Sequence, residues 1–520
     1  MGRFGIIRSF RWSSAAVAFL GLAGCAVTAD WPLIGSDDSG LFYEAYSTIA
    51  DYYIEPVTPE TLALAGLRNL ASADAGFSVE RRGGSVILNH GGSSTRFAAP
   101  APGDVDGWAR LTDTALKAAR ADSPAIEALS VDAAQELLLD GSLTALDRFS
   151  HYSTPDVARE RRASRDGFGG IGITVNTEAD DIRIAEILPK SPADNAGLRV
   201  DDRIVAIDGV EVASLPRSDI VQRLRGATDT AVTVQVERAG APQRLAFVMR
   251  RMFIVPPSVT LTEEARVARL RIANFNQQTA QSVADLLKRA HQDLGPDLRG
   301  IILDLRGNPG GLLDQSIEVV SLFIDGGPVT STIGRARDSI QHFSAPRREV
   351  ERLPLAVLVN GGSASASEIV ASALQDDGRA VVIGSASYGK GTVQNVQHLP
   401  NDGELTITWA RLITPGGYVL HEHGVVPTLC TADLPDDARA VAAVLKRDLG
   451  GAPAELNRPR ASLDEAGWKR LRALCPGQRE DHRIDVLTAE RLLADPALYA
   501  IAVRAPTTLA ARPVATAGMH

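Results

Sequence analysis

Two short motifs in the C-terminal half of this 520-residue chain contain a serine and a lysine in settings that suit chemistry. In residues 362–368, a turn of small residues carries Ser365 into the predicted start of a helix. In residues 388–394, Lys390 lies between two glycines. Serine is a poor nucleophile until a base removes its proton, and a neutral lysine can be that base. The pair predicts a serine nucleophile with a lysine general base, and so a protease that needs no histidine or metal.

Lys390 needs a lowered pKa for this role. The pKa of a free lysine is about 10.4, so it must fall by about 3 units for half of the amines to be neutral at pH 7. Burial alone can supply a fall of that size. The residues that flank Lys390 include no acid that would hold the positive charge, and Gln394 can hydrogen-bond the amine without charging it. The local sequence therefore suits a neutral lysine.

The residues alone leave other nucleophiles and bases open. Ser363 and Ser367 flank Ser365 in the same run. Glu368 is either a general base or a carboxylate in the first helical turn, where it favours the helix dipole. The order of residues does not exclude a Ser-His-Asp triad that uses a more distant histidine, either His398 or His421.

A metal site is not expected. His421 and His423 lie two residues apart in a glycine-containing loop, and the sequence indicates no third ligand for them. Protein zinc sites normally use three or four protein ligands. We therefore expect neither a metal nor a cofactor.

From residue 253 onward, strand-like and helix-like segments alternate. An apolar strand at 300–305 precedes the turn that contains Gly310 and Gly311, and another at 354–360 precedes the Ser365 turn. Repeated strand–helix units predict an α/β layer fold, in which ligands bind near the carboxyl ends of the strands. Both turns are expected at that edge.

The remaining segments are predicted mainly from hydrophobic periodicity. Two β-rich runs between residues 77 and 98 predict a small hairpin, residues 168–249 a compact β-rich unit, and the charged run 159–165 a linker. Helices are predicted at 41–53, 59–71, 105–121, 131–139, 279–292, 312–323, 436–449, 462–474 and 486–493.

Three motifs in this order resemble the carboxyl-terminal processing proteases, which are S41 serine peptidases with a PDZ domain. They are Asp-Leu-Arg-Gly-Asn-Pro-Gly-Gly at 304–311, Ser-Ala-Ser-Ala-Ser-Glu at 363–368 and Gly-Lys-Gly-Thr-Val-Gln at 389–394, and the likeness covers about residues 41–427. The resemblance implies a crotonase/Clp-like α/β core. It also implies these roles: nucleophile Ser365, base Lys390, lysine-orienting Gln394, and oxyanion donors from the backbone of Ala366 and of Gly311 or Gly310.

The resemblance extends to the β-rich unit at 168–249, which matches a PDZ domain. Its carboxylate-binding loop would be Gly170, Ile171 and Gly172. Such a domain binds a C-terminal peptide as an added strand and holds its carboxylate with backbone N–H groups. The implied partners are protein or peptide substrates with apolar C-termini, and an adaptor protein.

We expect a multidomain α+β protein. Its divisions are a signal peptide at 1–24, a tether at 25–40, a mainly helical N-terminal domain with a hairpin at 41–156, a PDZ domain at 157–250, a catalytic core at 251–430 and a helical C-terminal extension at 431–520.

The N-terminus reads as an export signal. Three arginines precede an apolar stretch at 15–23, which is too short to span a bilayer as a mature helix. It ends in Leu-Ala-Gly-Cys, which resembles a bacterial lipobox with Cys25 as the lipidated residue. The alternative is an ordinary signal peptide or a buried cysteine. We expect a periplasm-facing lipoprotein anchored in a membrane, and Ala26 after the cysteine favours the outer one.

Cys430 and Cys475 are the other cysteines. An exported protein lies where disulfides persist, so the two either pair or are unrelated small apolar residues. Spacing alone does not decide between these alternatives.

The net charge and the motifs limit the functions that this protein can have. A net charge of −9 and a pI of about 5.6 argue against nucleic-acid binding. The expected activity is endoproteolysis of cell-envelope proteins through recognition of their tails. The alternatives are a non-catalytic PDZ scaffold or adaptor, and acyl chemistry on small thioesters in a crotonase-like fold.

Overall fold

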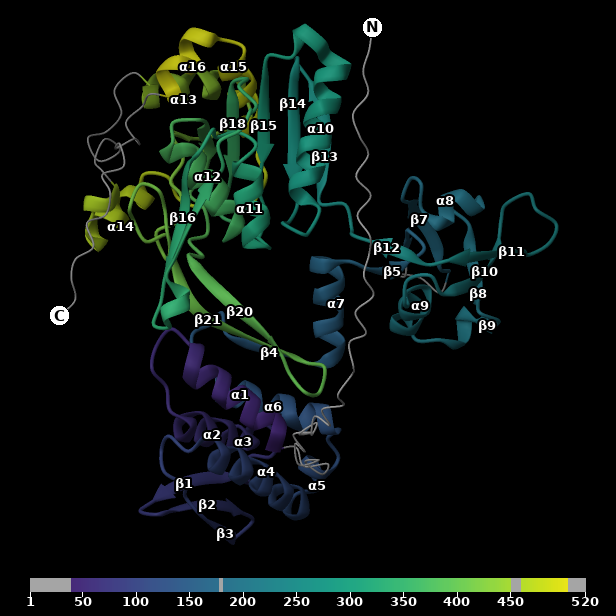
Figure 1. The fold of residues 1–520 in the computed structure, drawn as a ribbon, viewed down its shortest axis with the longest axis vertical. Helices are drawn as coiled ribbons and strands as arrows, with labels where there is room; N and C mark the ends of the chain where they lie inside the picture. Colours follow the sequence, from purple (N-terminus) through teal and green to yellow (C-terminus); the bar gives the residue numbers. More distant parts are fainter. Residues whose placement is uncertain (1–38, 177–180, 450–459, 504–520) are drawn as a thin grey trace, which may run out of the picture.

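The computed structural model describes residues 39–176, 181–449 and 460–503. The expected signal peptide, Cys25 and most of the tether lie outside these residues. Residues 39 and 40, expected in the tether, instead begin helix α1 (Ser39–Tyr52). Figure 1 shows an α/β core at one end, an N-terminal helical part at the other, and a β-rich unit to the side. Within the described residues, no helix is both long and apolar enough to cross a membrane.

The N-terminal part is a cluster of helices with a small sheet. Its helices begin where the sequence supplies caps: Thr58, Asp104 and Ser130 each accept a backbone N–H near a helix start. Phe42, Tyr46 and Trp108 are its largest fully buried side chains. The helices after α1 are α2 (Pro59–Arg68), α3 (Leu70–Ala73), α4 (Val105–Asp122), α5 (Pro124–Glu127) and α6 (Val131–Leu143).

The hairpin predicted between residues 77 and 98 is a three-stranded antiparallel sheet. Both glycine pairs in this stretch make turns, so the chain reverses twice. The strands are β1 (Ser78–Arg82), β2 (Ser85–His90) and β3 (Ser93–Ala98).

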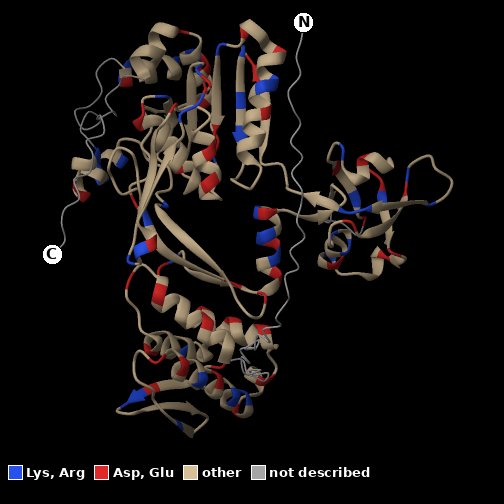
Figure 2. Ribbon diagram, viewed as in Figure 1, with Lys and Arg blue, Asp and Glu red and all other residues tan. Residues whose placement is uncertain are grey.

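The charged run expected to be a linker is a helix, so that prediction was wrong. Helix α7 (Pro155–Asp166) begins with a proline in its first turn and carries several arginines, seen as blue segments in Figure 2. Arg162 and Arg165 form ion pairs with Glu404 of the neighbouring sheet. These tertiary contacts stabilise a helix that shows little apolar periodicity.

The β-rich unit follows α7 directly. The chain enters it through β5 (Phe168–Gly170) and leaves through β12 (Met252–Ile254), and these two strands pair antiparallel. Its sheet has the order β11-β10-β8-β7-β6. The members of the unit are β6 (Ile173–Asn176), β7 (Arg183–Ile187), α8 (Pro192–Ala196), β8 (Arg203–Ile207), β9 (Val210–Glu211), α9 (Arg217–Leu224), β10 (Ala231–Glu237) and β11 (Leu245–Arg250).

The core is a six-stranded sheet that is parallel from its second strand onward. Strands β15 and β18 are buried along their whole length, as expected for a parallel sheet covered on both faces. The strand order is β13 (Val259–Glu264), β14 (Val267–Ile272), β15 (Gly300–Asp304), β18 (Leu355–Val359), β19 (Val381–Gly384) and β22 (Leu429–Cys430).

Helices cover both faces of this sheet. One face packs against α10 (Thr279–Leu294), α11 (Leu313–Val320) and α12 (Ala366–Asp376). The other face packs against α13 (Ala438–Leu449), α15 (Arg483–Leu493) and α16 (Pro496–Val503) of the C-terminal extension. The extension, which includes α14 (Glu465–Ala473), therefore completes the core of the α/β layer.

A second sheet links the core to the N-terminal helices. It has the order β17-β16-β21-β20, and β4 (His151–Ser153) also pairs with β21. Of its strands, only β21 shows an alternating pattern that predicts a strand at residues 405–413, because the other strands mix polar and apolar residues without clean alternation. The strands are β16 (Gly327–Ile333), β17 (Gln341–Ala345), β20 (Thr392–His398) and β21 (Glu404–Ile413).

Candidate active site

Ser365 lies at the N-terminus of α12, in the turn that follows β18. Its φ of 55° is in the left-handed region, which a residue with a side chain seldom adopts. Backbone strain of this kind gathers at functional sites. The neighbouring serines are fully buried and have structural roles: the Ser363 hydroxyl donates to the Leu305 carbonyl (2.8 Å) and the Ser367 hydroxyl to the Asn308 carbonyl (3.0 Å). Of the three serines, Ser365 is the one that lines a cavity.

This cavity, of about 890 Å³, is the meeting point of the predicted motifs. Ser365 and Lys390 both line it, from α12 and from the loop before β20. Gly311 lines it from the turn after β15, Phe149 from the segment before β4, and His151 from the first position of β4. The N-terminal part and the core thus both contribute walls to one site.

Two backbone N–H groups point to an oxyanion hole. Within the described residues, the N–H groups of Ala366 and Gly311 have no protein acceptor, whereas that of Gly310 donates to the Asn308 side chain (2.8 Å). Gly310 is instead needed for close packing, because a Cβ there would lie 2.8 Å from the Cβ of Ser365. Gly311 is therefore the better candidate of the two glycines for the second donor.

Lys390 is partly buried, and burial lowers its pKa. Its ammonium nitrogen lies 5.5 Å from the centre of the Phe149 ring. Glu368 and Asp147 oppose the fall in pKa through their charges, while Arg161 reinforces it. The sequence around Lys390 shows no acid, but the fold brings these two close in space.

Glu368 connects the serine turn to the lysine loop, a role that sequence reasoning missed. Its carboxylate is 0% exposed. One oxygen accepts the backbone N–H groups of Ser365 (2.8 Å) and Lys390 (2.9 Å), and the other accepts that of Gly389 (2.7 Å) and the Ser387 hydroxyl. With every contact a donor to it, the carboxylate acts as an acceptor that fixes the two motifs. Burial raises its pKa, and these four donors oppose the rise.

Ser365 and Lys390 line the same cavity but are not hydrogen-bonded to one another. No hydrogen bond joins Ser365 Oγ to Lys390 Nζ in the part of the chain that the structure describes. Gln394 lines the same cavity, but its amide donates to Thr392 Oγ1 (2.7 Å) and Thr408 Oγ1 (3.3 Å) and makes no hydrogen bond to Lys390. This differs from the expectation that Gln394 holds the amine directly.

The two histidines considered for catalysis do not line the cavity themselves. His398 is exposed at the end of β20, and His421 packs edge-on against the Phe149 ring at 5.9 Å. Neither makes a hydrogen bond to Ser365 among the described contacts. His151, which was not among the candidate catalytic residues, does line the cavity, and burial lowers its pKa. No group of three or more potential metal ligands gathers within the described ranges.

The predicted carboxylate loop borders a separate cavity of about 590 Å³ in the β-rich unit. Gly170, Ile171 and Gly172 line it together with β6, and Val221 and Leu224 of α9 form the facing side. This groove between a strand and a helix suits an extended peptide.

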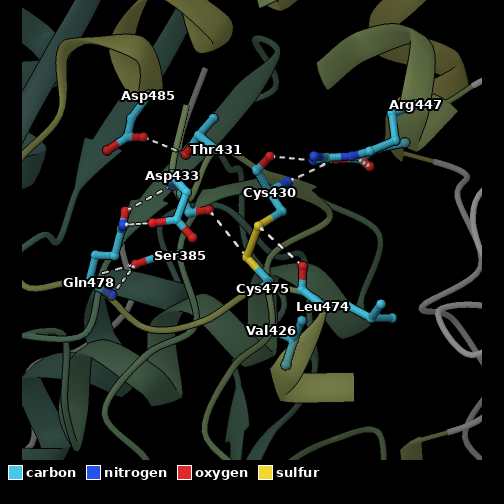
Figure 3. Close-up of a disulfide and its surroundings, with 12 residues drawn as sticks. Ser385, Val426, Cys430, Thr431, Asp433, Arg447, Leu474, Cys475, Gln478 and Asp485 are labelled. Carbon is cyan, nitrogen blue, oxygen red and sulfur yellow. Dashed lines mark hydrogen bonds and ion pairs between the residues drawn. A yellow bond between two sulfur atoms is a disulfide. The ribbon is translucent and has the colours of Figure 1, made fainter. Parts of the chain in front are cut away.

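Cys430 and Cys475 form a disulfide, with their Cα atoms 5.8 Å apart. It joins the end of β22 to the segment after α14 (Figure 3). The alternative of two unrelated cysteines is therefore excluded.

Chemically, this arrangement suits acyl transfer. A hydroxyl on a strained turn, a desolvated amine and two free N–H groups share one cavity, which are the parts needed to attack a carbonyl and to stabilise the resulting oxyanion.

Known protein families and relatives match large parts of this chain. Residues 266–430 match peptidase family S41, and residues 160–237 match the PDZ domain. The chain is 37% identical over 297 residues to a carboxy-terminal-processing protease of Bartonella bacilliformis, covering 56% of this chain and 68% of that one. It is 32% identical over 310 residues to a "Probable CtpA-like serine protease" of Staphylococcus aureus, covering 59% and 61% of the two chains. Among solved structures, the photosystem II D1 C-terminal processing protease is 24% identical, with a TM-score of 0.38 over 77% of this chain and 93% of that one.

Proposed function

Because this chain belongs to the S41 serine peptidases and resembles their carboxy-terminal-processing proteases, we propose that it cleaves proteins with a Ser365–Lys390 dyad. The observation that carries the proposal is the single cavity that Ser365, Lys390, Ala366 and Gly311 share. Lys390 accepts the hydroxyl proton as Ser365 Oγ attacks the scissile carbonyl, and the oxyanion is held by the N–H groups of Ala366 and Gly311. The lysine then gives the proton to the leaving amine, and water, with Lys390 again as base, releases the acyl group.

Substrates enter with an apolar C-terminal tail in the groove of the β-rich unit. The groove is lined by apolar side chains of β6 and α9, and the Gly170–Ile171–Gly172 loop supplies N–H groups for a terminal carboxylate. Helix α7 leads from the catalytic cavity directly into β5 at the edge of this groove. Tail capture thus places the rest of a substrate close to the catalytic cavity.

The proposed setting is the bacterial envelope. The basic N-terminus, the apolar stretch at 15–23 and the Leu-Ala-Gly-Cys motif support export and lipidation at Cys25, with a periplasm-facing protein on the outer membrane. Envelope proteins are then the substrates, with an adaptor as a further partner. Mass analysis of the mature N-terminus would test this, and an unmodified Cys25 in the cell would contradict it.

The test of the activity uses soluble protein that starts at Ala26. An unfolded protein with an apolar C-terminal tail is offered to the wild type, Ser365→Ala and Lys390→Ala, beside the same protein with two aspartates at its end. Cleavage of the apolar-tailed protein by the wild type alone supports the dyad. Equal cleavage by all three would show that the site is wrongly assigned.

A groove variant tests tail recognition separately. Val221→Asp places a charge in the apolar groove, and Val248→Asp, at a residue that is 71% exposed on β11, is the matched control. We expect Val221→Asp alone to raise KM for the tailed protein. No cleavage by any protein that contains Ser365 and Lys390 would favour a non-catalytic PDZ scaffold.

A further inference from the structure

We propose that residues 460–485 of the C-terminal extension are a brace for the catalytic lysine, with Arg472 as a positioning residue and the Cys430–Cys475 disulfide as its latch. This segment follows the part of the chain that matches peptidase family S41. The inference rests on the proposed Ser365–Lys390 site.

Helix α14 docks on the loop beside the lysine. Trp468 stacks on His423, with ring centroids 4.5 Å apart and planes 17° apart, and lies 4.8 Å from the ring of Tyr418. Trp468 and Leu471 are buried in one apolar cluster with Tyr418 and Cys475. Buried aromatic pairs of this kind fix the position of a helix.

Arg472 extends from this helix to the loop that carries Lys390. Its guanidinium donates to the carbonyl of Ser387 (3.0 Å), three residues before the lysine, and to the carbonyl of His423. The chain next to His423 is itself bonded to the lysine loop, because the N–H of Glu422 donates to the Gly389 carbonyl (2.9 Å). Arg472 therefore links the loop that contains Ser387 and Lys390 to the neighbouring loop that contains His423.

The charge of Arg472 also acts on this site. Its guanidinium interacts electrostatically with the buried Glu368, whose carboxylate also interacts with Lys390. The other charged groups that act on Lys390 are Asp147 and Arg161. Without Arg472, the carboxylate of Glu368 would lose a cation that interacts with it, and it would then favour the protonated form of Lys390 more strongly.

His151 and Arg148 complete the surroundings of the lysine. His151 lines the cavity, and its pKa is lowered mainly by burial and to a smaller extent by the charges of Arg161 and Lys390. The guanidinium of Arg148 lies 4.8 Å from the centre of the Phe149 ring, on which Lys390 also lies. Among the described residues, no hydrogen bond, ion pair or ring contact joins either residue to α14, so they do not substitute for Arg472.

The same segment contacts the serine turn. The Gln478 carbonyl accepts the N–H of Gly361 (2.5 Å), and the Asn360 amide donates to the Arg479 carbonyl (3.0 Å). Asn360 in turn accepts the N–H groups of Gly307 (2.8 Å) and Gly362 (2.9 Å). Residues 478–479 therefore fix the turn that leads to Ser365.

It also contacts the oxyanion turn. The buried Arg306, which precedes that turn, donates to the His482 carbonyl (2.7 Å) and pairs with Asp485 (3.1 Å). Arg271 pairs with Asp481 (2.7 Å) on the same side. Residues 472–485 of the extension thus form hydrogen bonds to the segments that carry all three catalytic motifs.

Along the chain, Cys475 lies between Arg472, which contacts the lysine loop, and residues 478–485, which contact the serine and oxyanion turns. Cys475 follows Arg472 by one helical turn and precedes Gln478, and Figure 3 shows the disulfide close to Gln478, Ser385 and Asp433. Cross-linking the segment to Cys430 limits how far it can separate from the core. Thiol–disulfide exchange with a dithiol converts the bond to two thiols and the dithiol to its own disulfide, which releases this limit.

The experiment measures peptide cleavage between pH 5 and 10 with full-length mature protein. The variants are Arg472→Ala, Arg472→Lys, and Arg470→Ala as a control from the exposed face of the same helix. For Arg472→Ala we expect kcat/KM to fall by about tenfold or more, mainly in kcat, and the acid limb of the pH profile to move to higher pH. Arg472→Lys keeps the charge but loses the two-pronged donor, so it should recover the position of the limb but only part of kcat.

Reduction supplies an independent measurement if Arg472→Ala fails to fold. Dithiothreitol should lower kcat of the wild type reversibly. It should not change kcat of the double variant Cys430→Ser/Cys475→Ser, which should be low without reduction because the variant has no disulfide. Unchanged cleavage after complete reduction, or an Arg472→Ala profile equal to that of Arg470→Ala, would overturn the brace. If Ser365→Ala cleaves as fast as the wild type, the proposed active site is itself wrong, and the proposal that Arg472 positions its lysine is then wrong as well.

Discussion

The ammonium nitrogen of Lys390 lies 5.5 Å from the centre of the Phe149 ring, although 241 positions separate the two in the chain (390 − 149). Phe149 belongs to the segment before β4, which reaches the cavity because β4 pairs with β21. The N-terminal part therefore provides apolar cover that shields the lysine amine from water. The main cause of the lowered pKa of Lys390 is burial, so this cover bears directly on catalysis.

Phe149→Ala should move the acid limb of kcat/KM to higher pH. The ring has two opposed effects, since it removes water from the amine but also attracts the ammonium by about 0.5–1 kcal/mol. At 5.5 Å the attraction is near its outer range, so loss of burial should dominate and raise the pKa of Lys390. Because the neutral amine is the proposed base, lowering the pH should then inactivate Phe149→Ala at a higher pH than it inactivates the wild type. Phe149→Leu keeps the apolar cover and should stay close to the wild-type profile, and a limb that moves to lower pH in Phe149→Ala would contradict this.

Glu368→Gln should lower kcat far more than it raises KM. A glutamine retains one acceptor oxygen but brings an NH₂ group against the N–H donors of Ser365, Lys390 and Gly389. We expect a loss of about 10²-fold in kcat and of about 2–3 kcal/mol in the free energy of unfolding, since hydrogen bonds to a buried charge are lost. Steady-state kinetics and urea denaturation measure the two effects. Wild-type kcat in a folded Glu368→Gln protein would exclude the positioning role.

Gly311→Ala should abolish most activity while leaving KM nearly unchanged. A Cβ at Gly311 would lie 2.1 Å from the Phe275 carbonyl oxygen, and the residue has a φ of 145°. The backbone must shift, and its N–H then leaves the oxyanion position, for which the typical cost is about 10²–10³ in rate. Circular dichroism checks the fold, and Gly417→Ala, in a positive-φ turn whose added Cβ would meet only Ala461 at 3.5 Å, is the control.

Ser363→Ala should remain an active peptidase of reduced stability. Its hydroxyl donates to the Leu305 carbonyl and accepts the N–H of Asn360 (2.9 Å), both inside the core. Leaving two buried groups without partners should cost about 1–3 kcal/mol each before relaxation, measured by urea denaturation. If Ser363→Ala is as inactive as Ser365→Ala but fully stable, the nucleophile has been assigned to the wrong serine.

Much of this site can be predicted from short stretches of the sequence. The strained turn around Ser365, the glycines beside Lys390 and the glycine pair after β15 are short motifs whose geometry depends on a few neighbouring residues. The same holds for the helices, whose caps and periodicity lie within about one turn. Family membership rests on these motifs too, and the enzyme class followed from them correctly.

Predictions of secondary structure failed where contacts with residues distant in the chain stabilise the element. The run at 159–165 reads as a linker, because it has many charges and few apolar residues, yet ion pairs to β21 and a proline at its start make it a helix. Strands β16, β17 and β20 were missed for a similar reason. These strands lie in an antiparallel sheet, and packing against neighbouring strands determines their residues more than a regular polar–apolar alternation does.

The sequence by itself determined which residues could react: a serine, a lysine and two glycine-rich turns, in an order that identifies the family. Only the tertiary structure decided how they are held. It showed that Gly311 and not Gly310 has a free N–H, that Glu368 joins the two motifs, that Phe149 covers the lysine and that the C-terminal extension lies behind all three motifs. The physical reason is that burial and hydrogen-bond pairing depend on segments far apart in the chain, and each donor or acceptor finds its partner only when these segments pack together.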